Sequence, residues 1–145
     1  IFCFRNKLMI IKSFELEKIK SKNNKLILIY GSNQGYKNQV IKELFEKLFE
    51  GEILRFDENE ILNKHEEFIS TLMNKSLFDE EKLIIISRAS DKILEFIDEI
   101  IKRKIEKVKI VINSNNLEKK SKLRRLLKKM TNLYVYLFMK TNDKK

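Results

Sequence analysis

The sequence predicts an α/β domain with a mainly parallel sheet and helices on both of its faces. Short apolar runs typical of buried strands recur along the chain, and stretches of about 10 to 15 residues with helical spacing of apolar side chains separate them. No internal repeat, low-complexity tract or linker rich in Pro, Gly or Ser interrupts this alternation. Because strands that alternate with helices are joined by right-handed crossovers, the order predicts three layers.

The expected strands are continuous apolar runs, as suits strands that are buried on both faces. They are KLILI, EILRF, KLIIIS and KVKIVIN, at residues 25–29, 52–56, 82–87 and 107–113.

Each expected helix has apolar residues three or four positions apart, which places them along one side. The segments are 38–50, 60–73, a stretch from Ser90 or Asp91 to Ile101, and 117–130. Gly51 can end the first helix, and Ser90 or Asp91 can cap the third.

The size and composition indicate one globular domain. A chain of 145 residues, 43% of them hydrophobic, is long enough for one core and too short for two. One cysteine, Cys3, excludes an internal disulfide framework, and a single histidine, His65, leaves no set of zinc ligands, so we expect His65 to pack or to face solvent. The longest apolar runs are far shorter than the ~20 residues of a membrane-spanning helix, and no secretion signal is evident. We therefore expect a cytoplasmic protein without membrane contact.

Charge is distributed unevenly along the chain. The net charge is +10, yet residues 41–81 hold twelve acidic residues against five basic ones, whereas residues 117–129 hold seven basic residues against one acidic. The basic segment could contact DNA phosphates, or it could be a solvated face in a lysine-rich chain, which is the interpretation that we prefer. The cations that would contact phosphate are Lys119, Lys120, Lys122, Arg124, Arg125, Lys128 and Lys129.

A glycine-containing turn follows the first expected strand. Residues 30–39 read YGSNQGYKNQ, which can be set against the phosphate-loop pattern GxxxxGK[ST]. In that pattern small residues let backbone N–H groups surround the phosphates, the lysine reaches the terminal ones, and the hydroxyl binds magnesium. Gly31 and Lys37 match, but Tyr36 replaces the second glycine and Asn38 replaces the hydroxyl. We expect a degenerate phosphate loop that lacks its magnesium anchor.

The acidic half of such a site is also missing. In phosphate-loop enzymes an acid at the end of a buried strand holds magnesium. The best candidate strand here ends Ile86, Ser87, Arg88, with no acid before Asp91. The sequence therefore predicts no catalytic residue, no cofactor and no ATP hydrolysis by this chain.

The stretch SLF at 76–78 lies between a predicted helix and the acidic DEE at 79–81. A Leu-Phe pair in such a break can pack under the sheet, which its spacing alone favours, or it can protrude as an anchor for a partner.

Taken together in this order, four blocks resemble the delta subunit of the bacterial DNA polymerase III clamp loader, specifically its N-terminal domain. The blocks are MIIKSFELEKI at 9–19, KLILIYGSNQGYKNQVIKEL at 25–44, FISTLMNKSLFDEEKLIIIS at 68–87 and VKIVINSNNLEKKSKLRRLLKK at 108–129. The resemblance covers residues 9 to 132.

The resemblance implies a P-loop NTPase fold of the AAA+ or RecA-like type that has lost its ATPase activity. It also implies that Ser76, Leu77 and Phe78 form the clamp-binding motif, whose Leu and Phe insert into a hydrophobic pocket of the ring-shaped beta sliding clamp and help to open one interface of the ring. ATP hydrolysis would belong to sister subunits, gamma or tau, and delta prime would be a further partner. Contact with DNA would be made through the assembled clamp-loader complex.

The family's chain continues into lid and collar domains, which this sequence does not contain. We expect the AAA+-like domain to occupy residues 9–140, with residues 1–8 as an upstream extension and residues 133–145 as a divergent strand or altered sequence. The alternative function is a small P-loop enzyme, similar to a nucleotide kinase, with an unusual loop.

Overall fold

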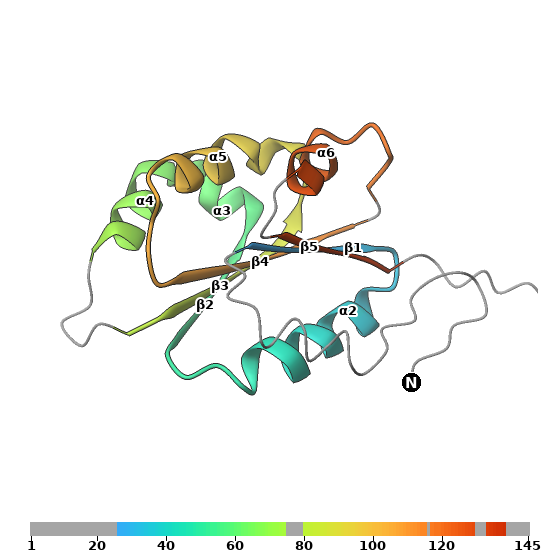
Figure 1. Ribbon diagram of the computed structural model, residues 1–145, viewed down its shortest axis with the longest axis horizontal. Coiled ribbons are helices and arrows are strands. Elements are labelled where there is room, and N and C mark those ends of the chain that lie inside the picture. The colour runs from blue at the N-terminus through green and yellow to red at the C-terminus, as the bar shows by residue number, and fades with distance from the viewer. Residues whose placement is uncertain (1–25, 75–79, 116, 130–132, 139–145) are drawn as a thin grey trace, which may run out of the picture.

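A computed structural model describes residues 26–74, 80–115, 117–129 and 133–138. It contains a five-stranded sheet between two layers of helices (Figure 1). The strands are β1 (Leu26–Gly31), β2 (Glu52–Asp57), β3 (Lys82–Ala89), β4 (Val108–Ser114) and β5 (Leu133–Phe138). The helices are α2 (Gln34–Val40), the π-helix η1 (Ile41–Glu46), α3 (Glu58–Asn63), α4 (His65–Met73), the 3-10 helix η2 (Asp91–Ile93), α5 (Leu94–Lys102) and α6 (Lys122–Lys129).

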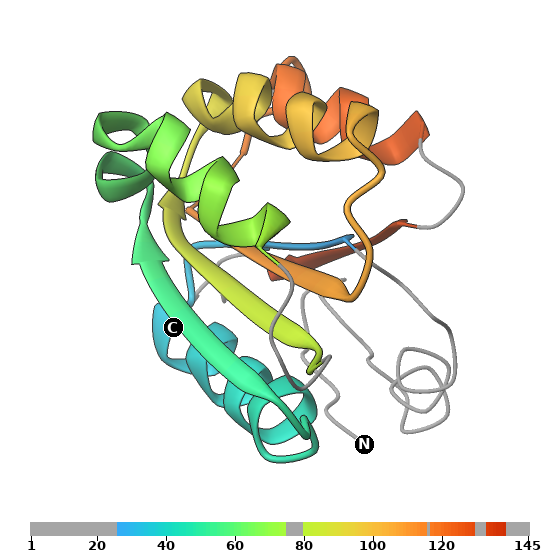
Figure 2. The same ribbon diagram turned by 90° about the vertical axis from the view of Figure 1, so that its left-hand side faces the viewer.

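The strands are arranged in the order β2-β3-β4-β1-β5, and all four pairings are parallel. Helices α3, α4, α5 and α6 cover one face, whereas α2 and η1 cover the other (Figures 1 and 2). The predicted α/β fold with a parallel sheet and helices on both faces is confirmed. Among the described residues no helix is long and apolar enough to cross a membrane.

Two apolar clusters hold the layers together, one on each face of the sheet. Side chains of a strand alternate between the faces, so Leu28 and Tyr30 of β1 pack toward α3–α6 while Ile27 and Ile29 pack toward α2 and η1. All four are at most 1% exposed. Burial on both sides explains why the β1 segment reads as a continuous apolar run rather than as an alternating pattern.

The predicted helix at 60–73 is two helices. The chain leaves helical geometry at Lys64, where φ is −128° and ψ is 40°, and α3 begins at residue 58 rather than 60. The start of α3 is fixed by a capping box, in which Asp57 accepts from the Asn59 amide at 3.1 Å and Glu60 accepts from the Asp57 amide at 2.9 Å.

Two other predicted helices begin elsewhere. The helix expected at 38–50 begins at Gln34, and its second half is the π-helix η1. The basic helix expected at 117–130 begins only at Lys122. The segment 133–139, whose structure the sequence left open, contains the edge strand β5.

Candidate functional site: the carboxyl edge of the sheet

The parallel strands all end at one edge, here called the carboxyl edge. The connection from β1 to β2 passes along the α2 face, whereas the connection from β4 to β5 passes along the opposite face (Figure 1). Because β1 and β4 are neighbours in the sheet, their carboxyl ends form a topological switch point. Ligands of open α/β sheets bind in the crevice at such a point. The turn with the degenerate phosphate loop, residues 31–38, lies there.

The turn between β1 and α2 is only two residues long. Gly31 ends β1 with φ at 139°, a left-handed value that favours glycine, and α2 already begins at Gln34. Residues 34–37, which would surround a phosphate in the GxxxxGK pattern, are therefore helical. The backbone cradle that the sequence suggested is largely absent.

The amide groups of this turn are already engaged within the chain. Gln34 N donates to Ser32 O at 3.0 Å, Tyr36 N donates to the Asn33 side chain at 3.1 Å, and Lys37 N donates to Asn33 O at 3.1 Å. A phosphate would have to break these bonds in order to bind as it does in a phosphate loop. The side chain of Asn33, the helix N-cap, occupies the place of an anion at the start of α2.

Lys37 does not face the solvent. Its side chain is fully buried, and Nζ donates to the carbonyl oxygen of Ser114 at 2.5 Å. Burial lowers the pKa of Lys37 from 10.5 to about 8. The lysine that matched the phosphate pattern instead joins α2 to the end of β4.

The neighbours of Lys37 also serve the fold. Tyr36 is half-buried against the α2-side cluster, and burial raises the pKa of its phenol. Asn38 is exposed; its Oδ1 accepts from Gln34 Nε2 at 3.0 Å and from Asn113 Nδ2 at 3.4 Å. The position that should carry a magnesium-binding hydroxyl therefore makes a second link to β4.

The end of β3 carries a cation where an acid is needed. Arg88 has φ at 56° and lies where the register between β3 and β4 shifts. Its guanidinium forms an ion pair with Asp57, which ends the neighbouring strand β2. The hydrogen bond from the Asn59 amide, together with Arg88, holds the pKa of Asp57 below its usual value. A carboxylate thus does lie at the carboxyl edge, but it caps a helix and pairs with an arginine.

Sequence reasoning missed Asp57 and its neighbour Glu58. Glu58 is 6% exposed and accepts from the Ser90 amide at 2.8 Å and from the Ser90 hydroxyl at 2.9 Å, which joins α3 to η2. The D-x-x-E spacing of Asp57 and Glu60, directly after the predicted strand 52–56, could have located Asp57 as a helix cap, whereas no local signal pointed to Glu58. Neither carboxylate is available to hold a metal ion. No group of three or more potential metal ligands occurs in the described residues.

An open cavity of about 660 Å³ lies along this edge. It is bounded by residues from the ends of four strands and the start of α2: Ser32, Gln34, Arg55, Phe56, Asp57, Ser87, Arg88 and Asn115. Its second arginine, Arg55, is also paired, with Glu46 at 2.9 Å. The cavity contains no lysine and no unpaired acid that could serve phosphoryl transfer.

The residues predicted to bind the clamp, Ser76, Leu77 and Phe78, lie outside the described residues. Their flanks are described: Met73, Asn74, Glu80 and Glu81 are all exposed. These flanks lie where β3 begins, at the edge of the sheet opposite the carboxyl edge.

The predicted phosphate contacts divide into two groups. Lys119, Lys120, Lys122 and Arg125 are exposed, and Lys120 pairs with Glu118 at 3.2 Å. Arg124 is half-buried, lies 5.3 Å from the centre of the Tyr30 ring and donates to Leu117 O at 3.5 Å. Its role in the fold is therefore to pack α6 on the sheet. The side chains of Lys128 and Lys129 lie outside the described part.

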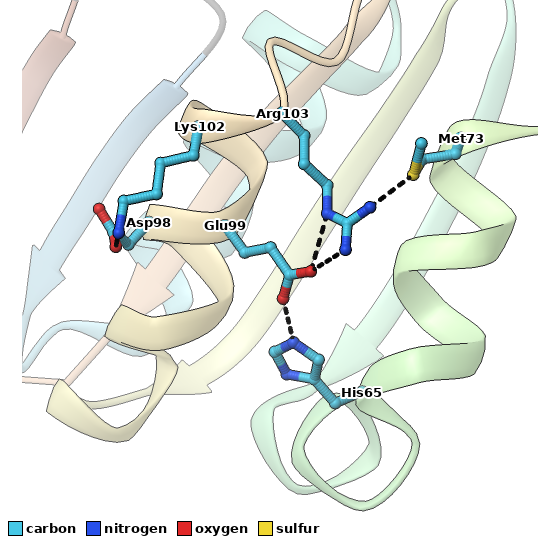
Figure 3. A network of polar contacts seen from close by, with 6 residues as sticks. All are labelled: His65, Met73, Asp98, Glu99, Lys102 and Arg103. Atoms are coloured by element: carbon cyan, nitrogen blue, oxygen red, sulfur yellow. Dashed lines mark hydrogen bonds and ion pairs between the residues drawn. The ribbon is translucent and has the colours of Figure 1, made fainter.

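His65 packs between α4 and α5. Its Nε2 lies 2.5 Å from Glu99 Oε2, and its ring meets Phe96 edge-on at 5.7 Å. Glu99 also accepts from Arg103, whose other nitrogen lies 3.2 Å from Met73 Sδ (Figure 3). The packing role expected of His65 agrees with this position.

No protein-family model matches this chain, and no curated protein resembles it significantly.

Proposed function

We propose that this chain is a nucleotide-binding-type domain without hydrolytic activity that binds a sliding clamp, as the N-terminal domain of a clamp-loader delta subunit. The observation that carries the proposal is the position of Lys37. A lysine whose ammonium is buried against the Ser114 carbonyl cannot reach a bound triphosphate without breaking the join between α2 and β4.

The fold supports a nucleotide-binding ancestry of the P-loop type. A parallel sheet, a glycine at the end of β1 and a helix that starts directly after it are the framework of a phosphate-binding turn. The turn also lies at the switch point, where such sheets bind ligands. The chain has the strand, the glycine and the helix of such a turn. The backbone amides of the turn, the Lys37 side chain and the Asp57 carboxylate, however, all bond to other groups of the same chain.

The partner role rests on the resemblance of the four sequence blocks and on the position of residues 76–78 in the sequence, between α4 and β3. A Leu and a Phe that fill a pocket on a partner can contribute several kcal/mol as interface hot spots, about 1.5–3 kcal/mol each by area. Contacts made better to an open ring than to a closed one shift the ring toward opening without any bond chemistry. Such a role needs no active site in this domain.

The competing proposal is a small P-loop enzyme similar to a nucleotide kinase, but the described residues do not provide the magnesium ligands that such an enzyme needs. Magnesium would need a hydroxyl at Asn38 and an acid at the end of β3, where Arg88 lies. Calorimetry with ATP and magnesium should give no binding heat. A micromolar, magnesium-dependent affinity would favour the enzyme instead.

The clamp proposal is tested by the affinity for the sliding clamp of the same bacterium, measured by calorimetry. The Leu77→Ala/Phe78→Ala variant should bind at least about 100-fold more weakly than the original chain, as expected for two hot-spot side chains. Leu48→Ala is the matched control, because Leu48 is 56% exposed on the α2 side and should not touch the clamp. Equal binding by the double variant and the original chain would remove the role assigned to the pair.

A further inference from the structure

Met73, the last residue of α4, is exposed to oxidation. Its side chain is 51% exposed, and it is the only methionine among the described residues, because Met9, Met130 and Met139 lie outside them. It borders an open cavity of about 480 Å³ between the end of α4 and the segment that follows α5. Met73 belongs to neither of the two apolar clusters of the core. A peroxide can therefore reach its sulfur, and an oxygen added there does not have to enter the core.

An oriented cation lies beside this sulfur. Arg103 Nη1, on α5, donates to Met73 Sδ at 3.2 Å (Figure 3). The rest of the guanidinium is held by Glu99, whose Oε1 accepts from Arg103 Nε at 2.8 Å and lies 2.6 Å from Nη2. The other oxygen of Glu99 lies 2.5 Å from His65 Nε2 on α4. The direction of Arg103 Nη1 is therefore fixed by contacts with both helices.

The bond between Arg103 and Met73 joins a strong donor to a weak acceptor. A guanidinium N–H is charged, whereas a thioether sulfur accepts hydrogen bonds poorly. Oxidation of the sulfur to a sulfoxide makes the side chain polar, with a negatively polarised oxygen that accepts well. The same guanidinium would then make a charge-assisted hydrogen bond to oxygen, and the open cavity leaves room for that oxygen.

We infer that Met73 is a site of reversible oxidation by hydrogen peroxide, and that its sulfoxide strengthens the link between α4 and α5 through Arg103. In the reaction a lone pair of Sδ attacks one peroxide oxygen, so the S–O bond forms as the O–O bond breaks. The departing hydroxide takes the proton of the transferred oxygen and leaves as water. The sulfur loses two electrons and the peroxide gains them. In the reverse direction, two thiols of a sulfoxide reductase form a disulfide, and the oxygen leaves as water.

The direction of the effect distinguishes such a switch from ordinary oxidative damage. Oxidation of a methionine that packs in a core places a polar group among apolar side chains and destabilises the fold. Met73 lies outside the core, and its sulfoxide gains a donor that is already in position. The oxidised chain should therefore be more stable than the reduced one.

The test is thermal unfolding of the full chain before and after treatment with hydrogen peroxide, with peptide mass spectrometry to measure the conversion of Met73. Relative to Met73→Leu treated in the same way, oxidation should raise the Tm by about 2 to 5 °C, as one improved hydrogen bond to a charged group would. The comparison with Met73→Leu removes the effects of oxidising Cys3 and the other three methionines. Treatment with a methionine sulfoxide reductase should restore the original Tm.

Two substitutions on α5 test the part assigned to Arg103. Arg103→Ala should abolish the gain in Tm on oxidation. Lys102→Ala removes the neighbouring cation, which pairs with Asp98, and should retain the gain. The shift is measured between the reduced and the oxidised form of each variant, so that a change in basal stability cancels.

Three results would overturn the inference. They are a gain that persists in Arg103→Ala, an oxidised chain that is no more stable than the reduced one, and a Met73 that stays unmodified while the other methionines are converted. None of these measurements involves a clamp, so their outcome is independent of the proposed function.

Discussion

Lys37 and Ser114 are joined across the switch point of the sheet, with the ammonium nitrogen 2.5 Å from the backbone carbonyl oxygen. This contact decides between the two uses of the β1–α2 turn. A lysine that bonds to the end of β4 stabilises the layer of α2 against the sheet, and it is withdrawn from any ligand in the crevice. The polar groups that match a phosphate-binding pattern in the sequence are here used as structural contacts.

The buried position of Lys37 predicts a stability gain at alkaline pH. Its pKa falls from 10.5 to about 8 on folding because burial disfavours the charged form. Between these values the unfolded chain binds more protons than the native one, so the free energy of unfolding rises with pH. Relative to Lys37→Met, the original chain should gain about 1 to 3 kcal/mol between pH 8 and 10.5, as measured by urea unfolding.

The control for this experiment is Lys42→Met, which removes an exposed lysine from η1. Its unfolding free energy should follow that of the original chain at every pH. If the free energy of unfolding depends on pH in the same way for the original chain and for Lys37→Met, the ammonium group of Lys37 is not buried in the native state.

Asp91 predicts a loss of stability in acid. Its carboxylate accepts from the Ser121 hydroxyl at 2.7 Å and from the amides of Leu123 at 2.9 Å and Lys122 at 3.1 Å, so it caps α6 from η2. Desolvation raises the pKa of Asp91, but these hydrogen bonds outweigh it and the pKa is lowered. The stabilisation is therefore complete above the unfolded pKa of about 3.9 and is lost as the pH falls through the lower folded value.

Asp91→Ala should lower the free energy of unfolding at pH 7 by about 1 to 2 kcal/mol, as removal of a helix cap does. Glu95→Ala, at an exposed acid in the first turn of α5, should change it by less than about 0.5 kcal/mol. Equal effects of the two substitutions would show that the cap contributes nothing.

Glu99 should titrate below its ordinary pKa of 4.5. The hydrogen bond with His65 is the main cause, followed by Arg103, and the bonds favour the ionised carboxylate. NMR detection of the Glu99 carboxyl carbon should show a midpoint that moves upward in His65→Ala. Lys102→Ala should leave this midpoint unchanged, because Lys102 pairs with Asp98 instead (Figure 3). A Glu99 titration midpoint that is the same in His65→Ala and in the original chain would contradict the hydrogen bond between His65 and Glu99.

Two glycines should respond oppositely to alanine. Gly51 has φ at 153°, and a Cβ there would lie 2.3 Å from the Glu81 carbonyl oxygen, so Gly51→Ala should destabilise by about 1 to 3 kcal/mol. A Cβ on Gly35 meets nothing closer than 4.0 Å, so Gly35→Ala in α2 should stabilise by up to about 1 kcal/mol. Thermal unfolding of both variants measures the difference. Destabilisation by Gly35→Ala would instead indicate that the turn needs close backbone approach.

The strands β1, β3 and β4 could be predicted from the sequence because they are buried on both faces and contain long apolar runs. The helix boundaries were harder, since apolar spacing continues across Lys64 although its backbone breaks the helix there. A local signal at Asp57 and Glu60 was present and would have corrected the start of α3. The spacing of apolar residues thus predicts which side of a helix is buried better than it predicts where the helix begins and ends.

The contacts that define the site could not be read from local sequence. Either Ser90 or Asp91 was expected to cap the next helix, and Ser90 does cap η2, whereas Asp91 caps α6, about thirty residues further on. Lys37 matched a phosphate-binding position, and only the position of β4 reveals its actual acceptor. In both cases a polar group is satisfied by a partner distant in the chain, which periodicity and motif spacing do not encode.

The place of β1 in the sheet has a consequence for how the molecule is made. Its LILIYG segment is synthesised before any other described strand, yet among these strands it pairs only with β4 and β5, which are synthesised after β2 and β3. Until then one of the most apolar stretches of the chain lacks both of its partner strands, a situation that slows folding and exposes the nascent chain to aggregation. Chaperone capture during translation is therefore expected to centre on this segment.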